Sequence, residues 1–158
     1  MDRDLHVVGF NVGRETFGVP IALVREIVRV PKITAVPDVP DYIEGVINLR
    51  GRIIPVMDLR KRLGEKDVRT SKKNRILVVE LEDKMVGMIV HSASEVLKIP
   101  PAEIAAPPPV VHEGELNYVT GVGKLHGRLI ILLDLANLLR KGELRRLGEL
   151  TQPAESVV

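Results

Sequence analysis

Two aspartates at equivalent places in the chain are the residues most able to do acid–base chemistry. Asp58 and Asp134 each follow a run of mostly aliphatic residues, and they are 76 positions apart. A pair of carboxylates can act as general acid and general base when both reach one substrate. An aspartate just before a short helix also accepts hydrogen bonds from the first backbone amides of that helix. Helix capping accounts for both residues without any chemistry, and we favour it.

The other reactive groups are scattered. The chain has no cysteine, which excludes disulfides, thiolate metal sites and thiol catalysis. No histidine pair has the spacing of HExxH, no glycine-rich phosphate loop occurs, and no serine lies in a Gly-x-Ser-x-Gly setting. These histidines and serines are His6, His91, His112, His126, Ser71, Ser92, Ser94 and Ser156. The sequence therefore predicts no catalytic, cofactor or metal site, and a protein that is not an enzyme.

One structural unit occurs twice in this chain. Gly45–Arg60 (GVINLRGRIIPVMDLR) aligns with Gly121–Ala136 (GVGKLHGRLIILLDLA) at a spacing of 76, with eight of sixteen positions identical. Upstream, Gly18–Pro31 aligns with Gly87–Pro100 at a spacing of 69. The second copy is therefore longer in its middle, where Pro107, Pro108 and Pro109 lie. Insertions are tolerated in surface loops, so we expect a loop there.

The elements that must position these residues are mostly short strands. Hydrophobic residues make up 45% of the chain but aromatics only 3%, so β-branched and other aliphatic residues must form the interior. The predicted hairpins pair His6–Val12 with Phe17–Val19, Val46–Leu49 with Arg52–Met57, Ile76–Leu81 with Met85–Val90, and Val119–Val122 with Arg128–Leu133. A further strand is predicted at Val30–Val36.

Short helices are predicted between these strands. One begins at Ile21, because Leu23, Val24, Ile27 and Val28 follow at helical spacing. The other predicted helices run from Asp58 to Gly64, from Asp134 to Gly142 and over Glu143–Leu150.

These elements predict a mainly β fold with two tandem SH3-like five-stranded β-barrel subdomains, short helices and a C-terminal helix. We expect one domain over residues 1–150, with barrels at about 7–75 and 76–142 that exchange elements, and a flexible tail over 151–158. Small barrels close their edges and leave no deep pocket. The expected function is therefore to present surfaces to other macromolecules.

Charge is concentrated in one segment. The net charge is +2, yet Arg60–Arg75 holds eight basic residues against Glu65 and Asp67, which gives +6 locally. An alternative function is therefore a small-barrel nucleic-acid-binding protein that uses this segment. Its weakness is that such barrels stack bases on aromatic side chains, and none lies in the basic run. The N-terminus has no signal-peptide pattern and the longest apolar run is Leu129–Leu133, so we expect a cytoplasmic protein without direct membrane insertion.

Three stretches resemble the CheW family of bacterial chemotaxis coupling proteins. They are VPDYIEGVINLRGRIIPVMDLRKRLG from Val39 to Gly64, FGVPIALVREI upstream, and YVTGVGKLHGRLIILLDLANLL downstream. The resemblance runs from Val7 to about Leu139. It implies two intertwined five-stranded barrels and a non-catalytic adaptor. Such an adaptor joins a CheA-type histidine kinase to the cytoplasmic tips of methyl-accepting chemoreceptors. It binds no nucleic acid and reaches membrane receptor arrays through its partners.

The resemblance also implies a coupling site at the tip of the second predicted hairpin. Arg50 follows Asn48 and Leu49 there, and in this family the arginine of Asn-Leu-Arg-Gly is tied to kinase and receptor coupling. Gly45 and Ile47 lie on the strand before it. Two other interpretations remain open: Arg50 as a solvated turn residue, and Gly45 as a turn glycine with positive φ.

A receptor-binding groove is the second implied site. Val24 and Glu26 lie on the helix predicted from Ile21, and the resemblance places them at a hydrophobic groove between the barrels, with Ile27 and Ile99 as lining. Apolar anchors flanked by charge suit a groove that accepts a helix. Taken alone, Val24 also fits a core position and Glu26 a solvated face.

Overall fold

The structure is a computed structural model that describes residues 3–107 and 118–139. Its strands are β1 Leu5–Val12, β2 Glu15–Pro20, β3 Val24–Arg29, β4 Ile43–Leu49, β5 Arg52–Asp58, β6 Arg75–Leu81, β7 Lys84–Val90, β8 Ser92–Ile99, β9 Ile104–Ala105, β10 Val119–Leu125 and β11 Arg128–Leu133. Its helices are the 3-10 turns Ile21–Leu23 and Pro101–Glu103 and the α-helices α1 Leu59–Arg62 and α2 Leu135–Leu138.

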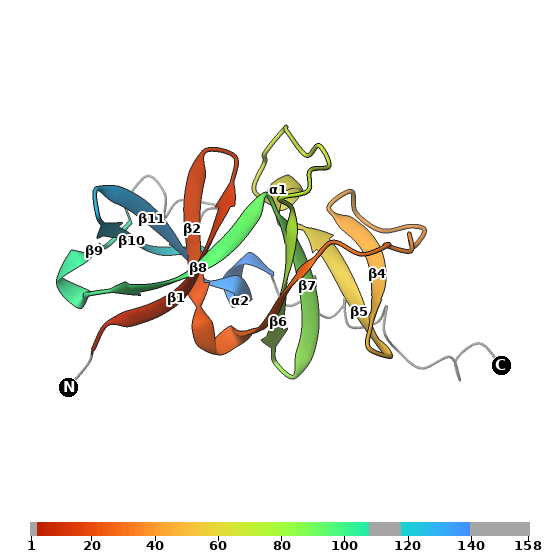
Figure 1. The fold of residues 1–158 in the computed structure, drawn as a ribbon, viewed down its shortest axis with the longest axis horizontal. Coiled ribbons are helices and arrows are strands. Elements are labelled where there is room, and N and C mark those ends of the chain that lie inside the picture. The colour runs from red at the N-terminus through yellow and green to blue at the C-terminus, as the bar shows by residue number, and fades with distance from the viewer. Residues whose placement is uncertain (1–2, 108–117, 140–158) are drawn as a thin grey trace.

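The strands form two sheets that lie in two lobes (Figure 1). Sheet A has the order β8-β1-β2-β11-β10-β9, and sheet B has the order β3-β6-β7-β5-β4. Sheet B has the five strands of a small SH3-like barrel, and sheet A has a sixth only because the two-residue β9 adds to it. The prediction of a mainly β fold with two such subdomains is confirmed.

Each sheet contains a hairpin from the other half of the chain. The β1–β2 hairpin lies in sheet A beside strands of the second copy, and the β6–β7 hairpin lies in sheet B beside strands of the first. On one side each exchanged hairpin makes a parallel pair, β2 with β11 and β7 with β5, through register partners such as Phe17 with Ile131 and Met57 with Met88. On its other side each makes an antiparallel pair, β1 with β8 and β6 with β3. Neither half of the chain can therefore complete a sheet alone.

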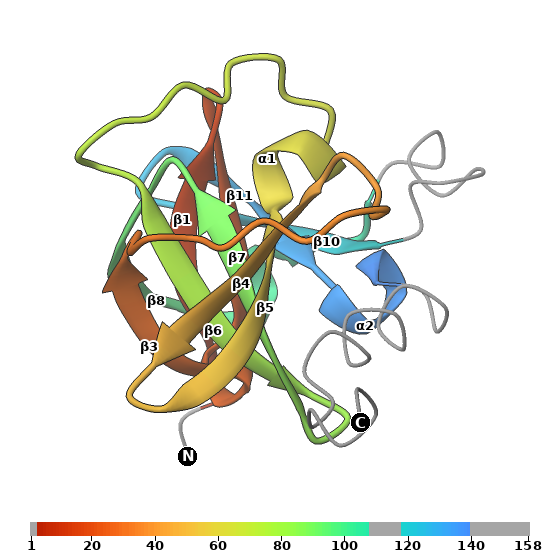
Figure 2. The same cartoon turned by 90° about the vertical axis from the view of Figure 1, so that its right-hand side faces the viewer.

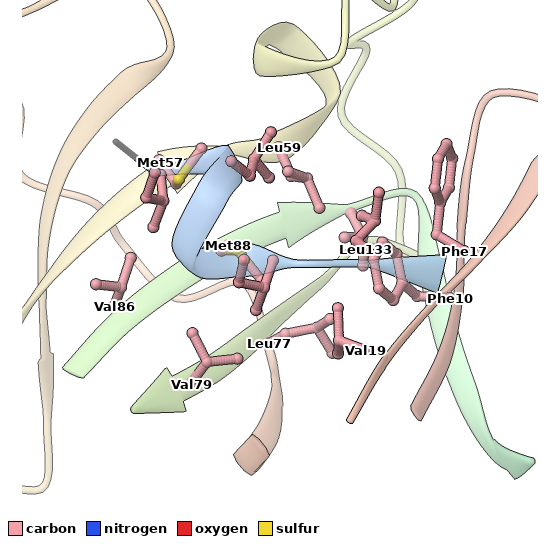
Figure 3. Packing of buried hydrophobic residues seen from close by; sticks show 14 of the residues in the cluster. Phe10, Phe17, Val19, Met57, Leu59, Leu77, Val79, Val86, Met88 and Leu133 are labelled. Carbon is pink, nitrogen blue, oxygen red and sulfur yellow. The ribbon is translucent and has the colours of Figure 1, made fainter. Parts of the chain in front are cut away.

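The exchanged hairpins are buried on both faces. On β6, Ile76 and Val78 face the small cluster inside sheet B, whereas Leu77 and Val79 face a larger cluster that lies between the sheets. We call the latter the interlobe cluster (Figure 3). Its fully buried members come from the two exchanged hairpins, from β5 and from both α-helices, and they include Phe10, Val19, Met57, Leu59, Leu77, Val79, Val86, Met88, Val90 and Leu138. The two lobes therefore share one hydrophobic core.

The sequence repeat has a structural counterpart at the turns and caps. The β4–β5 turn has positive φ at Arg50 and Gly51, of 52° and 87°, and the β10–β11 turn has 51° and 77° at His126 and Gly127. Two consecutive positive φ values match the twist of a two-residue hairpin. Asp58 then accepts a hydrogen bond from the Arg60 amide at the start of α1. The predicted hairpin tips are confirmed.

Two local predictions are wrong. Val24–Arg29 forms strand β3 rather than a helix, and only Ile21–Leu23 makes a helical turn. The burial of β3 alternates along the strand, because it pairs with β6 at the edge of sheet B. Val30–Val36 forms no strand, and within it only Thr34 makes a bridge, to Val46. The eight-residue strand β8 was not predicted at all.

Several predicted features lie outside the described residues. They are Pro108 and Pro109 of the insert, His112, the end of a helix at Gly142, the helix over Glu143–Leu150 and the tail over 151–158. Within the described part, α2 ends at Leu138. No helix there has the length and apolar character that crossing a membrane requires.

Candidate functional site

An ion pair joins the β4–β5 hairpin tip to strand β3. Arg50 Nη1 donates to Glu26 Oε1 at 2.8 Å, and Arg50 Nη2 contacts the same oxygen. The Arg50 side chain remains 65% exposed and that of Glu26 32% exposed. Asn48 Oδ1 accepts from the Gly51 amide at 2.8 Å and so braces the turn. The structure thereby brings together three predicted site residues, Arg50, Asn48 and Glu26.

The position of this pair in sheet B gives it a structural consequence. β3 and β4 are the two ends of the strand order, so they do not hydrogen-bond to each other as a ladder. Viewed end-on, sheet B curls until β3 and β4 approach each other (Figure 2). The Glu26–Arg50 contact spans this gap, and it fixes where an exposed guanidinium stands relative to the edge strand.

Gly45 and Ile47 are buried beneath the tip. Ile47 is 1% exposed and belongs to the cluster inside sheet B. Gly45 has φ 141° at a bulge in the β4–β5 register, and a Cβ there would lie 1.9 Å from the Thr34 carbonyl oxygen. Neither residue presents a side chain at the surface, because Gly45 has none and that of Ile47 is buried.

The four residues predicted to line a receptor groove do not share one surface. Val24 is half-buried and packs against the interlobe cluster, while Ile27 is 38% exposed. Burial alternates along β3, so Glu26 and Ile27 face opposite ways, and a bulge between Val24 and Glu26 separates Val24 from the rest of the strand. Ile99 is fully buried in the cluster inside sheet A. As the structure stands, Glu26 and Ile27 are the members of this set with side chains available to a partner.

Several charges of the basic segment serve the fold. Arg60 is 4% exposed and makes a two-point contact with Asp58, from Nε to Oδ1 at 3.0 Å and from Nη2 to Oδ2 at 2.9 Å. Arg62 Nη2 donates to the Leu138 carbonyl at 3.0 Å, which links α1 to α2. These cations are held by protein groups, so they are not available to phosphates.

Two further cations of this segment are also paired. Lys61 Nζ lies 2.8 Å from Glu44 Oε1, and its hydrogen bond to Glu44 raises the pKa of Lys61 although burial opposes the rise. Arg69 contacts both oxygens of Asp67 at about 3 Å, and these hydrogen bonds lower the pKa of Asp67 to about 2. The observed pairing weakens the case for a nucleic-acid interface on this segment.

The aspartates and histidines do not assemble a reactive centre. Asp58 and Asp134 each accept from backbone amides of the helix that follows, as capping predicts. His91 Nδ1 accepts from the Gly13 amide at 2.9 Å, and Nε2 lies 2.8 Å from the Asp67 carbonyl. Among the residues that the structure describes, no cluster of three or more acidic or histidine side chains is able to hold a metal ion.

Tyr42 and Tyr118 are a further repeated pair that the alignment of the two copies did not include. The backbone carbonyls of Tyr42 and Tyr118 accept from the amides of Asp58 and Asp134, at 2.6 and 2.7 Å. The two tyrosines are 76 positions apart, so extending the aligned segment three residues upstream finds them. Each of these hydrogen bonds links the start of a hairpin, β4–β5 or β10–β11, to the aspartate that caps the following helix.

Comparison with known proteins identifies the family of this chain. Residues 6–143 match the model of the CheW-like domain. This chain belongs to the CheW family. It is 33% identical to the chemotaxis protein CheW of Klebsiella aerogenes over 135 residues, which cover 85% of this chain and 81% of that protein. It is 34% identical to CheW of Helicobacter pylori over 137 residues, covering 87% and 82%.

The fold agrees with that of a solved CheW structure. The scaffolding protein TtCheW from Thermoanaerobacter tengcongensis superposes with a TM-score of 0.80 at 38% sequence identity, covering 89% of this chain and 95% of that one. Membership of the CheW family places the chain among chemotaxis scaffold proteins rather than enzymes. The resemblance seen in the sequence is confirmed.

Proposed function

We propose that this chain is a non-catalytic adaptor that couples methyl-accepting chemoreceptors to a CheA-type histidine kinase. Family membership supports a scaffold role, and the described part of the chain offers surfaces rather than a centre of clustered reactive groups. The adaptor would be cytoplasmic and would reach membrane receptor arrays through its partners. It needs no cofactor.

The observation that carries this proposal is the Glu26–Arg50 contact. It places a largely exposed guanidinium beside an edge strand that also exposes Ile27. Charged groups at the edge of a protein–protein interface set binding specificity and association rate, and apolar side chains nearby supply affinity. We assign Arg50, with Asn48 bracing its turn, to kinase and receptor coupling. We assign Glu26 and Ile27 on β3 to the receptor side, with Val24, Gly45 and Ile47 packed beneath this part of sheet B, whereas Ile99 belongs to the interior of the other lobe and makes no direct contact in this assignment.

Two partner surfaces on one rigid body have an energetic consequence. When the receptor holds the adaptor, the kinase contact becomes nearly intramolecular, and the effective concentration of the second partner rises. Both assigned surfaces lie on sheet B, where the strand ladders and the Glu26–Arg50 contact keep them in a fixed relation. This supports coupling by a single domain without a hinge.

The test is reconstitution of kinase activity with receptor-containing membranes, a CheA-type kinase and this chain. Arg50→Ala should lower kinase activation, and Ile27→Glu should reduce binding of the chain to receptor membranes. Arg14→Ala, an exposed arginine in the β1–β2 turn, serves as the matched control and should behave like the unaltered chain. Full activation by the Arg50→Ala protein would reject the assigned coupling role, and absence of any activation by the unaltered chain would reject the adaptor function.

A further inference from the structure

A surface hollow of about 790 Å³ lies at one end of sheet B. Its walls come from the chain just after β3, from the end of β5 with α1, and from the loop between α1 and β6, which arches over this end of the sheet (Figure 2). The expectation of a fold without any deep pocket overlooked it, because the hollow is made by a loop outside the sheet. Its volume is within the ordinary range for ligand sites, and the mouth of a barrel is a common place for one.

The charges in the floor of the hollow are neutralised within the protein. Arg60 is paired with Asp58, and Lys61 with Glu44, by the contacts described above. A ligand therefore meets no unpaired carboxylate there. Any net field must come from the rim.

Two cations without acidic partners in the described part of the chain, Arg29 and Lys72, lie at that rim, and Arg75 stands behind Arg29 outside the lining. Arg29 at the end of β3 lies directly opposite Arg75 of β6 in the antiparallel register. Arg75 Nη1 donates to the carbonyls of Lys72 and Asn74, each at 2.8 Å, so no carboxylate neutralises it in those contacts. The side chains of Arg29 and Lys72 are exposed, line the hollow and make no ion pair within the described residues. Like charges opposite each other across a ladder are destabilising, and an anion bound to Arg29 in the hollow relieves its repulsion by Arg75.

The walls between the cations are aliphatic. Val30, Pro31, Ile33, Val68 and Ile89 line the hollow, together with the polar Thr70 and Ser71. None of its lining side chains is aromatic, so it offers nothing for nucleic-acid bases to stack on. Aliphatic walls under a cationic rim instead suit a chain that alternates aliphatic side chains with carboxylates.

We propose that this hollow binds an acidic, aliphatic peptide segment of a partner protein in extended conformation. Arg29 and Lys72 pair with its carboxylates, and the wall of Val30, Ile33 and Val68 takes its aliphatic side chains. The lining includes neither Glu26 nor Arg50, so this is a separate docking surface from the coupling site.

Fluorescence anisotropy with the full chain tests the proposal directly. The probe is a short labelled peptide that alternates glutamate with leucine, and the reference probe replaces each glutamate with glutamine. The acidic probe should bind at least about tenfold more tightly than the glutamine probe. Its affinity should fall as salt is raised, since exposed charges are screened.

Variants locate the binding site. The double variant Arg29→Glu, Lys72→Glu should lose about tenfold or more in affinity for the acidic probe. Lys98→Glu with Lys124→Glu makes the same change in net charge on exposed residues of sheet A and should bind as the unaltered chain does. Because Arg29→Glu puts an acid opposite Arg75, the double variant should stay folded, and its circular dichroism spectrum checks this. The neutral pair Arg29→Gln, Lys72→Gln should show an intermediate loss.

Three results overturn the proposal. One is failure of the acidic probe to bind more tightly than the glutamine probe. The second is equal loss of affinity in the sheet A control. The third is tighter binding of a labelled single-stranded oligonucleotide, lost in the Arg29→Glu, Lys72→Glu protein, which would identify the rim as a nucleic-acid surface.

Discussion

Arg50 donates to Glu26 across the gap between the two edge strands of sheet B. The pair joins the β4–β5 hairpin tip to β3, which lies at the other end of the strand order. The position of the guanidinium therefore depends on how far sheet B curls. Both side chains are substantially exposed. Exposed ion pairs contribute about 0.2–1 kcal/mol to stability, so the pair is better suited to positioning than to holding the fold.

The Glu26–Arg50 pair could matter because it positions the hairpin tip or because the Arg50 guanidinium itself contacts a partner. The charge-swapped protein Glu26→Arg, Arg50→Glu distinguishes these two roles. We expect Arg50→Ala to lower the free energy of unfolding by less than about 1 kcal/mol and still to weaken partner binding. The swap restores the ion pair but removes the cation from the tip, so it should not restore binding if the guanidinium itself touches a partner. Urea unfolding and a pull-down of receptor membranes with kinase measure the two effects. Full rescue by the swap would show that the pair matters only for shape.

Much of the fold could be predicted because its signals are local. Repeated glycines and arginines marked the two hairpin tips, and an aspartate after an aliphatic strand marked each cap. The helix at Ile21 was wrong because Val24, Ile27 and Val28 fit helical spacing, whereas the pairing of β3 with β6 decides the backbone. That pairing joins residues about 50 positions apart, and no local pattern reports it.

The candidate site was predictable only in part for the same reason. Arg50 and Glu26 were each chosen from the sequence, but their contact depends on the curl of sheet B, which no residue type encodes. Ile99 and Ile47 have the side chains of a binding groove, yet burial assigns them to the two lobe interiors. Apolar identity alone cannot separate a core position from a docking position.

The two equivalent helix caps should differ in strength. Asp58 is 2% exposed, accepts from the Arg60 amide and pairs with the buried Arg60 guanidinium. Removing a partner from a buried pair costs about 3–5 kcal/mol because a charge is left uncompensated. Asp134 accepts from the Ala136 and Asn137 backbone amides and makes no ion pair with any residue that the structure describes. Loss of a cap alone costs about 0.5–2 kcal/mol.

We therefore expect Asp58→Ala to destabilise the protein by at least about 1 kcal/mol more than Asp134→Ala. Denaturant unfolding of the two variants measures the difference. The double variant Asp58→Ala, Arg60→Met should recover part of the loss, since it leaves no buried charge. Equal destabilisation by the two single variants would mean that the Arg60 pair adds nothing to the cap.

Substitutions of Gly45, beneath the hairpin tip, and of Gly51, at the tip, should have different effects on stability. Gly45 has φ 141° and a Cβ there would meet the Thr34 carbonyl carbon and oxygen, whereas Gly51 has φ 87° with open space around it. Gly51→Ala then suffers only the backbone cost of a positive φ, about 1–2 kcal/mol. Gly45→Ala adds a steric clash with a rigid backbone and should unfold at clearly lower denaturant concentration. If Gly45→Ala is no less stable than Gly51→Ala, the bulge is not held by the Thr34 segment.

The Asp67 carboxylate offers a pH test of the loop between α1 and β6. Hydrogen bonds from Arg69, followed by the charges of Arg69 and His91, lower the pKa of Asp67 from 3.8 to about 2. A depressed carboxyl pKa stabilises the folded loop above about pH 4, and that contribution is lost as the pH falls toward 2.

We expect the side-chain carbonyl resonance of Asp67 to titrate near pH 2 in the unaltered chain. In Arg69→Gln its midpoint should move up toward 3.8, because the guanidinium contacts at both carboxylate oxygens are gone. Lys66→Gln is the control, because it removes a nearby charge that makes no such contact, and it should leave the midpoint in place. A midpoint near 4 in the unaltered chain would show that the Asp67–Arg69 pair does not form in solution.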